Sequence, residues 1–132
     1  MTQEVWKAFN QNLLSHSAAH YLMAVHVIQN RKGYARLTDI SSELNISAAS
    51  ASQSLKTLLN KNLIKENEDK FFQLTDFGLK QIELVEKNKQ LALTFFTEIL
   101  GVSFEQADTD SCKIEHLLSA ETSEKLEKFL KK

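Results

Sequence analysis

The chain has 132 residues, about the size of one ordinary domain or of two very small ones. Its 16 Lys and Arg residues nearly balance 17 Asp and Glu residues, which excludes a globally basic nucleic-acid coat protein and requires any DNA contact to come from a local patch. A single cysteine excludes an intrachain disulfide framework, and without a signal peptide or an apolar run of membrane length we expect no membrane contact and a cytoplasmic protein.

The first half of the chain predicts three helices. Apolar residues recur with helical spacing from about Gln3 to Arg31, which indicates one long helix. Thr38 is a favourable N-cap for a short helix over 39–44. After a tight turn, Ser47 is expected to cap another helix over about 48–60.

The second half predicts a hairpin and then further helices. Residues 63–64 and 71–74 are expected to form two short strands, joined by the polar turn 67–69. Three more helices follow, from the cap Thr75 to about Leu100, from the capping box at Ser103 to near Ser119, and over 121–130. The fold class is therefore mainly α. The order helix, helix, helix, strand, strand, helix is that of a winged helix-turn-helix. We expect this domain over 1–75 and an all-helical arm over 76–132.

The second helix of a helix-turn-helix lies in the major groove, with its N-terminal residues at the base edges. Ala49 suits a thymine methyl group, and Gln53 can pair with adenine. The candidate DNA-binding residues, including basic residues for phosphates, are Arg36, Ser47, Ala49, Ser50, Ser52, Gln53 and Lys56. The alternative is that serine and alanine only cap and solvate a surface helix. Since one such helix gives too little affinity, we expect a homodimer on a palindromic operator in double-stranded DNA.

Cys112, Glu115 and His116 occupy positions i, i+3 and i+4, and so share one face of a helix. Thiolate, carboxylate and imidazole together suit Fe(II), Zn(II), Co(II) or Ni(II) better than Ca or Mg. Three ligands leave a metal short of at least one partner. The first helix offers His16, His20 and Met23, although a histidine on a mostly apolar face is more often a core residue.

Five motifs carry a family resemblance: His20-Tyr21-Leu22, Gly33 to Ile40, Leu74 to Gly78, Ile99 to Val102, and Cys112 to Ser119. From about His20 to Leu130 the chain resembles the diphtheria toxin repressor and manganese transport regulator family of metal-dependent transcriptional repressors. The resemblance implies a DNA-binding domain over 1–75 and a helical metal-binding and dimerisation domain over 76–132. It also implies a short form without the SH3-like domain of many iron-type relatives.

Carried over residue by residue, the resemblance implies a metal site of His20, Cys112, Glu115 and His116. The positions of an ancillary site in relatives fall on Lys89, Leu93 and Asp108, which together cannot replace the ligands, so we expect no ancillary site and a Lys89–Asp108 salt bridge instead. Met23 stands where manganese-type relatives carry a further carboxylate, so a binuclear manganese site is not supported. The expected cofactor is Fe2+, with Zn2+ second and Mn2+ third.

The resulting hypothesis is a dimeric repressor of metal-uptake genes that a divalent transition metal activates. The alternative is a metal-independent winged-helix regulator that senses oxidants through Cys112 or binds a small molecule. An enzyme is not expected, because the sequence offers no separate general base and no substrate-cleft motif.

Overall fold

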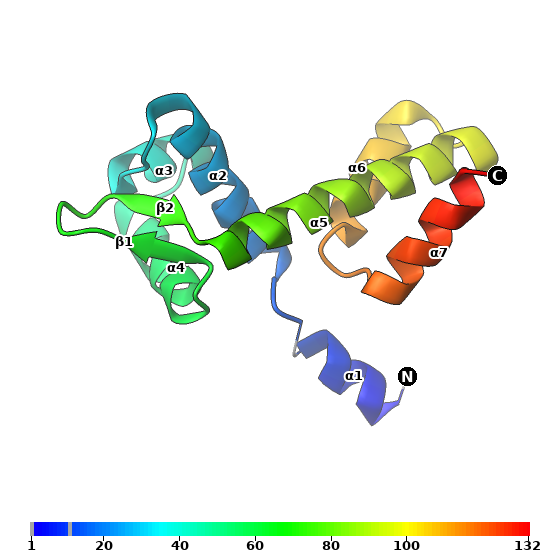
Figure 1. The fold of residues 1–132 in the computed structure, drawn as a ribbon, viewed down its shortest axis with the longest axis horizontal. Coiled ribbons are helices and arrows are strands. Elements are labelled where there is room, and N and C mark those ends of the chain that lie inside the picture. The colour runs from blue at the N-terminus through cyan, green and yellow to red at the C-terminus, as the bar shows by residue number, and fades with distance from the viewer. Residues whose placement is uncertain (1, 11) are drawn as a thin grey trace. The chain divides into compact units, whose positions relative to one another are not determined.

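The computed structural model describes residues 2–10 and 12–132, and Met1 and Gln11 lie outside the described residues. The chain forms two compact units (Figure 1). The first joins the residues up to His16 with residues 84–132, and the second spans Ser17–Glu83. The units therefore divide the chain at different points from the boundary expected between residues 75 and 76, because helices α2 and α5 each run through both. No helix in the described part of the chain is long and apolar enough to cross a bilayer.

The second unit has the element order expected of a winged helix-turn-helix. Its elements are most of α2 (His16–Lys32), α3 (Leu37–Leu44), α4 (Ala48–Asn60), β1 (Ile64–Glu66), β2 (Phe72–Leu74) and the start of α5 (Asp76–Thr94). The two strands pair antiparallel, with Ile64 opposite Leu74. Ala35, in the loop before α3, forms an isolated bridge to Phe72 and so ties that loop to the wing. The predicted fold class is confirmed.

A continuous apolar core holds the second unit together. Removing such side chains from water supplies the main driving force for folding. The fully buried members come from every helix of the unit and from the wing: Leu22, Val25, Ile28, Ile40, Leu55, Leu58, Leu63, Ile64 and Ile82. Gly78 lets α5 approach this core closely, because a Cβ atom there would lie 2.0 Å from the carbonyl oxygen of Leu63.

The caps around the helix-turn-helix explain where its helices begin. The Ser47 hydroxyl accepts a hydrogen bond from the Ser50 backbone N–H at 3.1 Å, as predicted. The α3 cap was predicted wrongly, because α3 begins at Leu37 and not after Thr38. The Asp39 carboxylate instead accepts the Arg36 backbone N–H at 3.0 Å, which satisfies a donor that the helix start leaves without an intrahelical partner.

The first unit is all-helical. It contains α1 (Gln3–Asn10), the later part of α5, a π-helix η1 (Phe95–Ile99), α6 (Phe104–Ile114) and α7 (Ala120–Leu130). The single long helix expected from Gln3 to Arg31 is wrong, since residues 12–15 are not helical. In this stretch the Asn12 side chain donates to the backbone carbonyl of His116 at 3.0 Å, a tertiary bond that competes with a continuous helix.

Helix α6 ends at Ile114, before the expected end near Ser119. A tight turn follows, closed by a 2.9 Å hydrogen bond from the Leu117 N–H to the Ile114 carbonyl. Ser119 then caps α7 by accepting the Thr122 N–H at 3.2 Å, as predicted. The early end of α6 places Glu115 and His116 in a turn.

Candidate functional site

The three candidate ligands of the C-terminal motif lie at the end of α6. Cys112 is in the last turn of the helix, and Glu115 and His116 are in the tight turn that follows. The Cys112 sulfur lies 4.0 Å from Oε1 of Glu115. Glu115 is only 2% exposed, whereas Cys112 and His116 are partly exposed. The structure thus brings the Cys112 thiol and the Glu115 carboxyl group together, next to His116 in the chain. The three residues lie at the end of a helix and in the turn after it, and not on one continuous helix.

Two asparagines hold the turn in place. Asn88, 1% exposed on α5, donates from Nδ2 to the Glu115 carbonyl at 3.1 Å, and Asn12 donates to the next carbonyl, that of His116. These bonds satisfy carbonyls that the end of α6 leaves without helical partners. Sequence reasoning missed both residues. A polar Asn88 between the core residues Val85 and Ala92 was the one available signal.

His16 joins this cluster from the start of α2. Its ring centroid lies 5.4 Å from that of His116, with the planes inclined at 53°. The ligand atoms of His16 and Cys112 lie within 4.8 Å of one another. The predicted ligand His20 follows one turn later on α2 and belongs to the second unit, so its participation stays a prediction. Of the three residues His16, His20 and Met23 considered from the sequence, the structure therefore supports His16 as a candidate within the first unit.

The electrostatic surroundings oppose negative charge in this cluster. Burial raises the pKa of Glu115, the Lys89 ammonium lowers it, and Asp108 and Glu86 raise it. Burial also raises the pKa of the Cys112 thiol, and the Glu115 carboxylate raises it further. A divalent cation would favour both ionised forms, because ligands must lose their protons to bind it. Sulfur, nitrogen and oxygen donors around the buried Glu115 carboxylate fit a transition metal.

The expected salt bridge is confirmed. Lys89 Nζ lies 3.3 Å from Asp108 Oδ1, and both side chains are partly exposed. Leu93, one turn after Lys89 on α5, contributes only hydrocarbon. An ion pair and a leucine therefore occupy the three positions at which the sequence predicts that no ancillary metal site forms.

The predicted DNA-binding residues of α4 lie mostly at the surface. Ala49, Gln53 and Lys56 are exposed and follow i, i+4, i+7 spacing, so they share one face. Ser47 and Ser50 are exposed too, but their hydroxyls hydrogen-bond each other at 3.0 Å. Their observed role is therefore in the N-terminal cap of α4. The partly exposed Ser52 lines a hollow between α4 and the wing, together with Leu37, Leu55, Lys56, Leu59, Glu66, Lys70 and Phe72.

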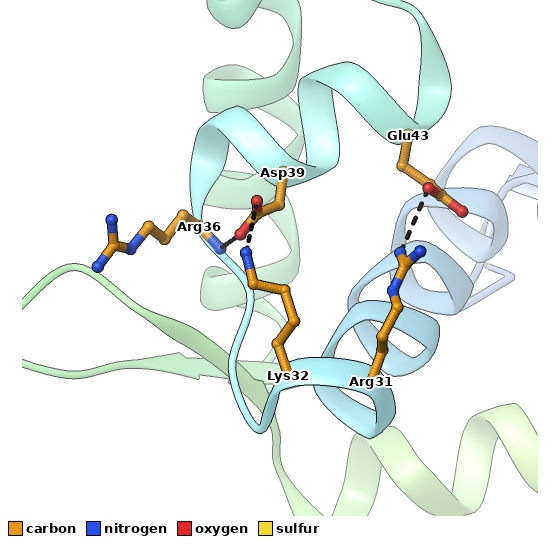
Figure 2. A network of polar contacts seen from close by, with 5 residues as sticks. All are labelled: Arg31, Lys32, Arg36, Asp39 and Glu43. Carbon is orange, nitrogen blue, oxygen red and sulfur yellow. Dashed lines mark hydrogen bonds and ion pairs between the residues drawn. The ribbon is translucent and has the colours of Figure 1, made fainter.

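Arg36 differs from the two other basic residues around the loop before α3 (Figure 2). Arg31 pairs with Glu43 at 3.5 Å, and Lys32 pairs with Asp39 at 3.0 Å. The Arg36 side chain extends away from both pairs, and in the described part of the chain its guanidinium forms no ion pair with a carboxylate. Its charge remains available at the surface.

Two family models match most of the chain. Residues 13–70 match "Iron dependent repressor, N-terminal DNA binding domain", and residues 75–132 match "Iron dependent repressor, metal binding and dimerisation domain". The first match contains the helix-turn-helix and strand β1 of the wing, and it ends just before β2. The second contains Cys112, Glu115 and His116.

Two individual relatives and one solved structure are similar to most of the chain. The chain is 26% identical over 121 residues to an uncharacterized HTH-type transcriptional regulator of Methanocaldococcus jannaschii, covering 90% of this chain and 96% of that protein. It is 24% identical over 111 residues to the diphtheria toxin repressor of Corynebacterium diphtheriae, covering 84% of this chain and 49% of the repressor, so it spans about half of that relative. The crystal structure of a hypothetical protein from Sulfolobus solfataricus superposes with a TM-score of 0.79 at 22% identity over 89% of each chain, which supports the fold.

Proposed function

Because the chain belongs to the iron-dependent repressor family, whose members are DNA-binding transcriptional regulators and not enzymes, we propose that it is a metal-activated dimeric repressor of metal-uptake genes. One observation carries the proposal: the cluster of Cys112, Glu115 and His116 occurs in the same chain as a winged helix-turn-helix with an exposed recognition face. The recognition helix α4 falls within the range matched to the DNA-binding domain, and the cluster falls within the range matched to the metal-binding domain.

The proposed metal ligands are His20, Cys112, Glu115 and His116. His16, also on α2, is a further candidate because of its closeness to Cys112. The thiolate disfavours Mn(II) relative to Fe(II) and Zn(II), so iron is proposed first, zinc second and manganese third. The raised pKa of the Cys112 thiol argues against the oxidant-sensing alternative, because thiolate is the form that oxidants attack.

When bound, the cation supplies the positive charge that holds both anionic ligands ionised. His20 is on the helix that leads into the DNA-binding unit, whereas Cys112, Glu115 and His116 are in the other unit. Ligands from both units would restrict how the two move, which removes an entropic cost from binding DNA. By linkage, operator DNA then tightens metal binding by the same factor.

On DNA, Ala49 and Gln53 are proposed to meet base edges, with Ser52 beside them and Ser47 and Ser50 at the start of the helix. Arg36 and Lys56 are proposed to contact phosphates. The dimer would present two such faces to a palindromic operator. Apolar surface on the helical unit supports dimerisation, since Ile99 is 50% exposed, Leu100 59% and Phe104 64%.

The test is anaerobic selection of duplexes from a random-sequence pool, with Fe(II), with Zn(II), with Mn(II) and with chelator. We expect metal to be required and the selected duplexes to be palindromic. The variants His20→Ala and His16→Ala are then titrated on the selected duplex. A His20→Ala protein that responds to metal like wild type contradicts the proposed role of His20, and equal binding with metal and with chelator contradicts metal activation.

A further inference from the structure

Two aromatic rings, one of them at the end of the wing's turn, form a platform beneath Arg36. Tyr34 comes from the loop before α3, and Phe71 is the residue immediately before β2. Their rings stack with centroids 4.2 Å apart and planes 17° from parallel. The Arg36 guanidinium carbon lies 4.6 Å from the Phe71 centroid and 5.5 Å from the Tyr34 centroid. Both distances are within the range of a cation–π contact.

The backbone beneath this platform is tightly held. The Ala35 N–H donates to the Phe72 carbonyl at 3.0 Å, and the Phe72 N–H donates back at 2.7 Å. The Gln73 side chain also donates to the Gly33 carbonyl at 2.9 Å. At the wing tip, Asn67 Oδ1 accepts the Phe71 N–H at 3.0 Å. The two rings therefore belong to segments that hydrogen bonds fix to each other.

A guanidinium that stacks on an aromatic face keeps its N–H donors available, because they point outward in the plane of the group. Arg36 is exposed and borders an open hollow, together with Leu37, Thr38, Asp69, Lys70 and Phe71. The neighbouring Arg31 and Lys32 already have carboxylate partners. In the described part of the chain, Arg36 is thus the one of these three cations that lies over the Phe71 ring and forms no ion pair.

We propose that Tyr34 and Phe71 are positioning residues that hold the Arg36 guanidinium for a phosphate of the DNA backbone. The inference rests on the proposed DNA-binding function and goes beyond it, because it assigns a role to two aromatic residues outside the recognition helix. Holding a long side chain in its binding rotamer before DNA arrives removes part of the entropy cost of forming the contact. A bidentate Arg–phosphate contact profits most from this, since it requires a defined orientation.

The test is a double-mutant cycle with Phe71→Leu and Arg36→Ala. Binding of metal-loaded protein to a fluorescent random-sequence duplex is measured by anisotropy, since a phosphate contact does not depend on sequence. We expect Phe71→Leu to weaken binding about threefold to tenfold in the wild-type background. In the Arg36→Ala background the same change should have no effect. Phe71→Tyr, which keeps a ring at this position, should bind like wild type.

Thermal unfolding of each variant separates positioning from folding, and Tyr34→Leu serves as the second probe if Phe71→Leu does not fold. An equal loss of affinity on Phe71→Leu with and without Arg36 overturns the inference, as does an unchanged affinity in the wild-type background. If the metal-loaded wild type fails to bind the duplex at all, the proposed DNA-binding function itself is overturned.

Discussion

The close approach of helix α5 to Leu63 predicts that Gly78→Ala destabilises the protein. The added Cβ would lie 2.0 Å from the Leu63 oxygen and 3.0 Å from its carbonyl carbon, so the two backbones must separate by about 1 Å to reach a tolerable contact. The Leu63 carbonyl also accepts the Thr75 N–H at 3.1 Å, at the point where α5 begins. Separation therefore strains a hydrogen bond as well as the packing.

The sign of the effect distinguishes packing from helix propensity. Propensity alone predicts that alanine stabilises a helix by about 1 kcal/mol relative to glycine. Overpacking costs about 1–3 kcal/mol, and a weakened hydrogen bond costs about 1 kcal/mol more. The free energy of unfolding should therefore decrease by about 1–3 kcal/mol, which lowers Tm by several degrees.

Urea unfolding of the metal-free chain, followed by circular dichroism, measures this change. Lys80→Ala, on an exposed position of the same helix, is the matched control and should stay within about 0.5 kcal/mol of wild type. A Gly78→Ala protein as stable as wild type, or more stable, would refute the argument from close packing.

Three further predictions concern the candidate metal cluster. Because burial raises the folded-state pKa of Glu115 above 4.5, its ionisation opposes folding without metal, and stability is lost as the pH rises through the raised value. Glu115→Gln should remove that loss in urea unfolding across pH, and a constant difference from wild type at every pH would contradict the cause. A double-mutant cycle on Lys89 and Asp108 should give a coupling of about 1 kcal/mol or less, since the pair is partly exposed; a much larger coupling would contradict this estimate. Asn88→Ala should lower the free energy of unfolding by about 1–3 kcal/mol and weaken Co(II) binding about tenfold or more. An unchanged Co(II) affinity would show that the hydrogen bond from Asn88 to the Glu115 carbonyl does not position the cluster.

Local signals predicted much of the DNA-binding unit correctly. Ser47 and Thr75 both cap helices as expected, because a hydroxyl at that position satisfies a backbone N–H that has no helical partner. The wing followed from two β-prone segments around a polar turn. The Lys89–Asp108 pair also formed as expected. In each case the residues that decide the structure are near in sequence or come from a recognised motif.

The sequence predicted helix ends wrongly where residues distant in the sequence determine them. The helical periodicity from Gln3 to Arg31 is real on both sides of the break, but the bond of Asn12 to the His116 carbonyl joins residues 104 positions apart. The end of α6 at Ile114 likewise depends on distant residues. Asn88 and Asn12 donate hydrogen bonds to the carbonyls of Glu115 and His116, which have no helical partners. Neither effect is visible in a window of neighbouring residues. The closeness of His16 to Cys112 is missed for the same reason.

The most direct test of the metal-site proposal is an anaerobic Co(II) titration of wild type and of Cys112→Ser, followed by absorption. A thiolate ligand gives an intense charge-transfer band, and the weaker d–d bands report the coordination number. We predict the intense band in wild type, its loss in Cys112→Ser, and saturation at one Co(II) per chain, because the ancillary positions hold Lys89 and Asp108. A wild-type protein without the band would contradict a metal site built on Cys112.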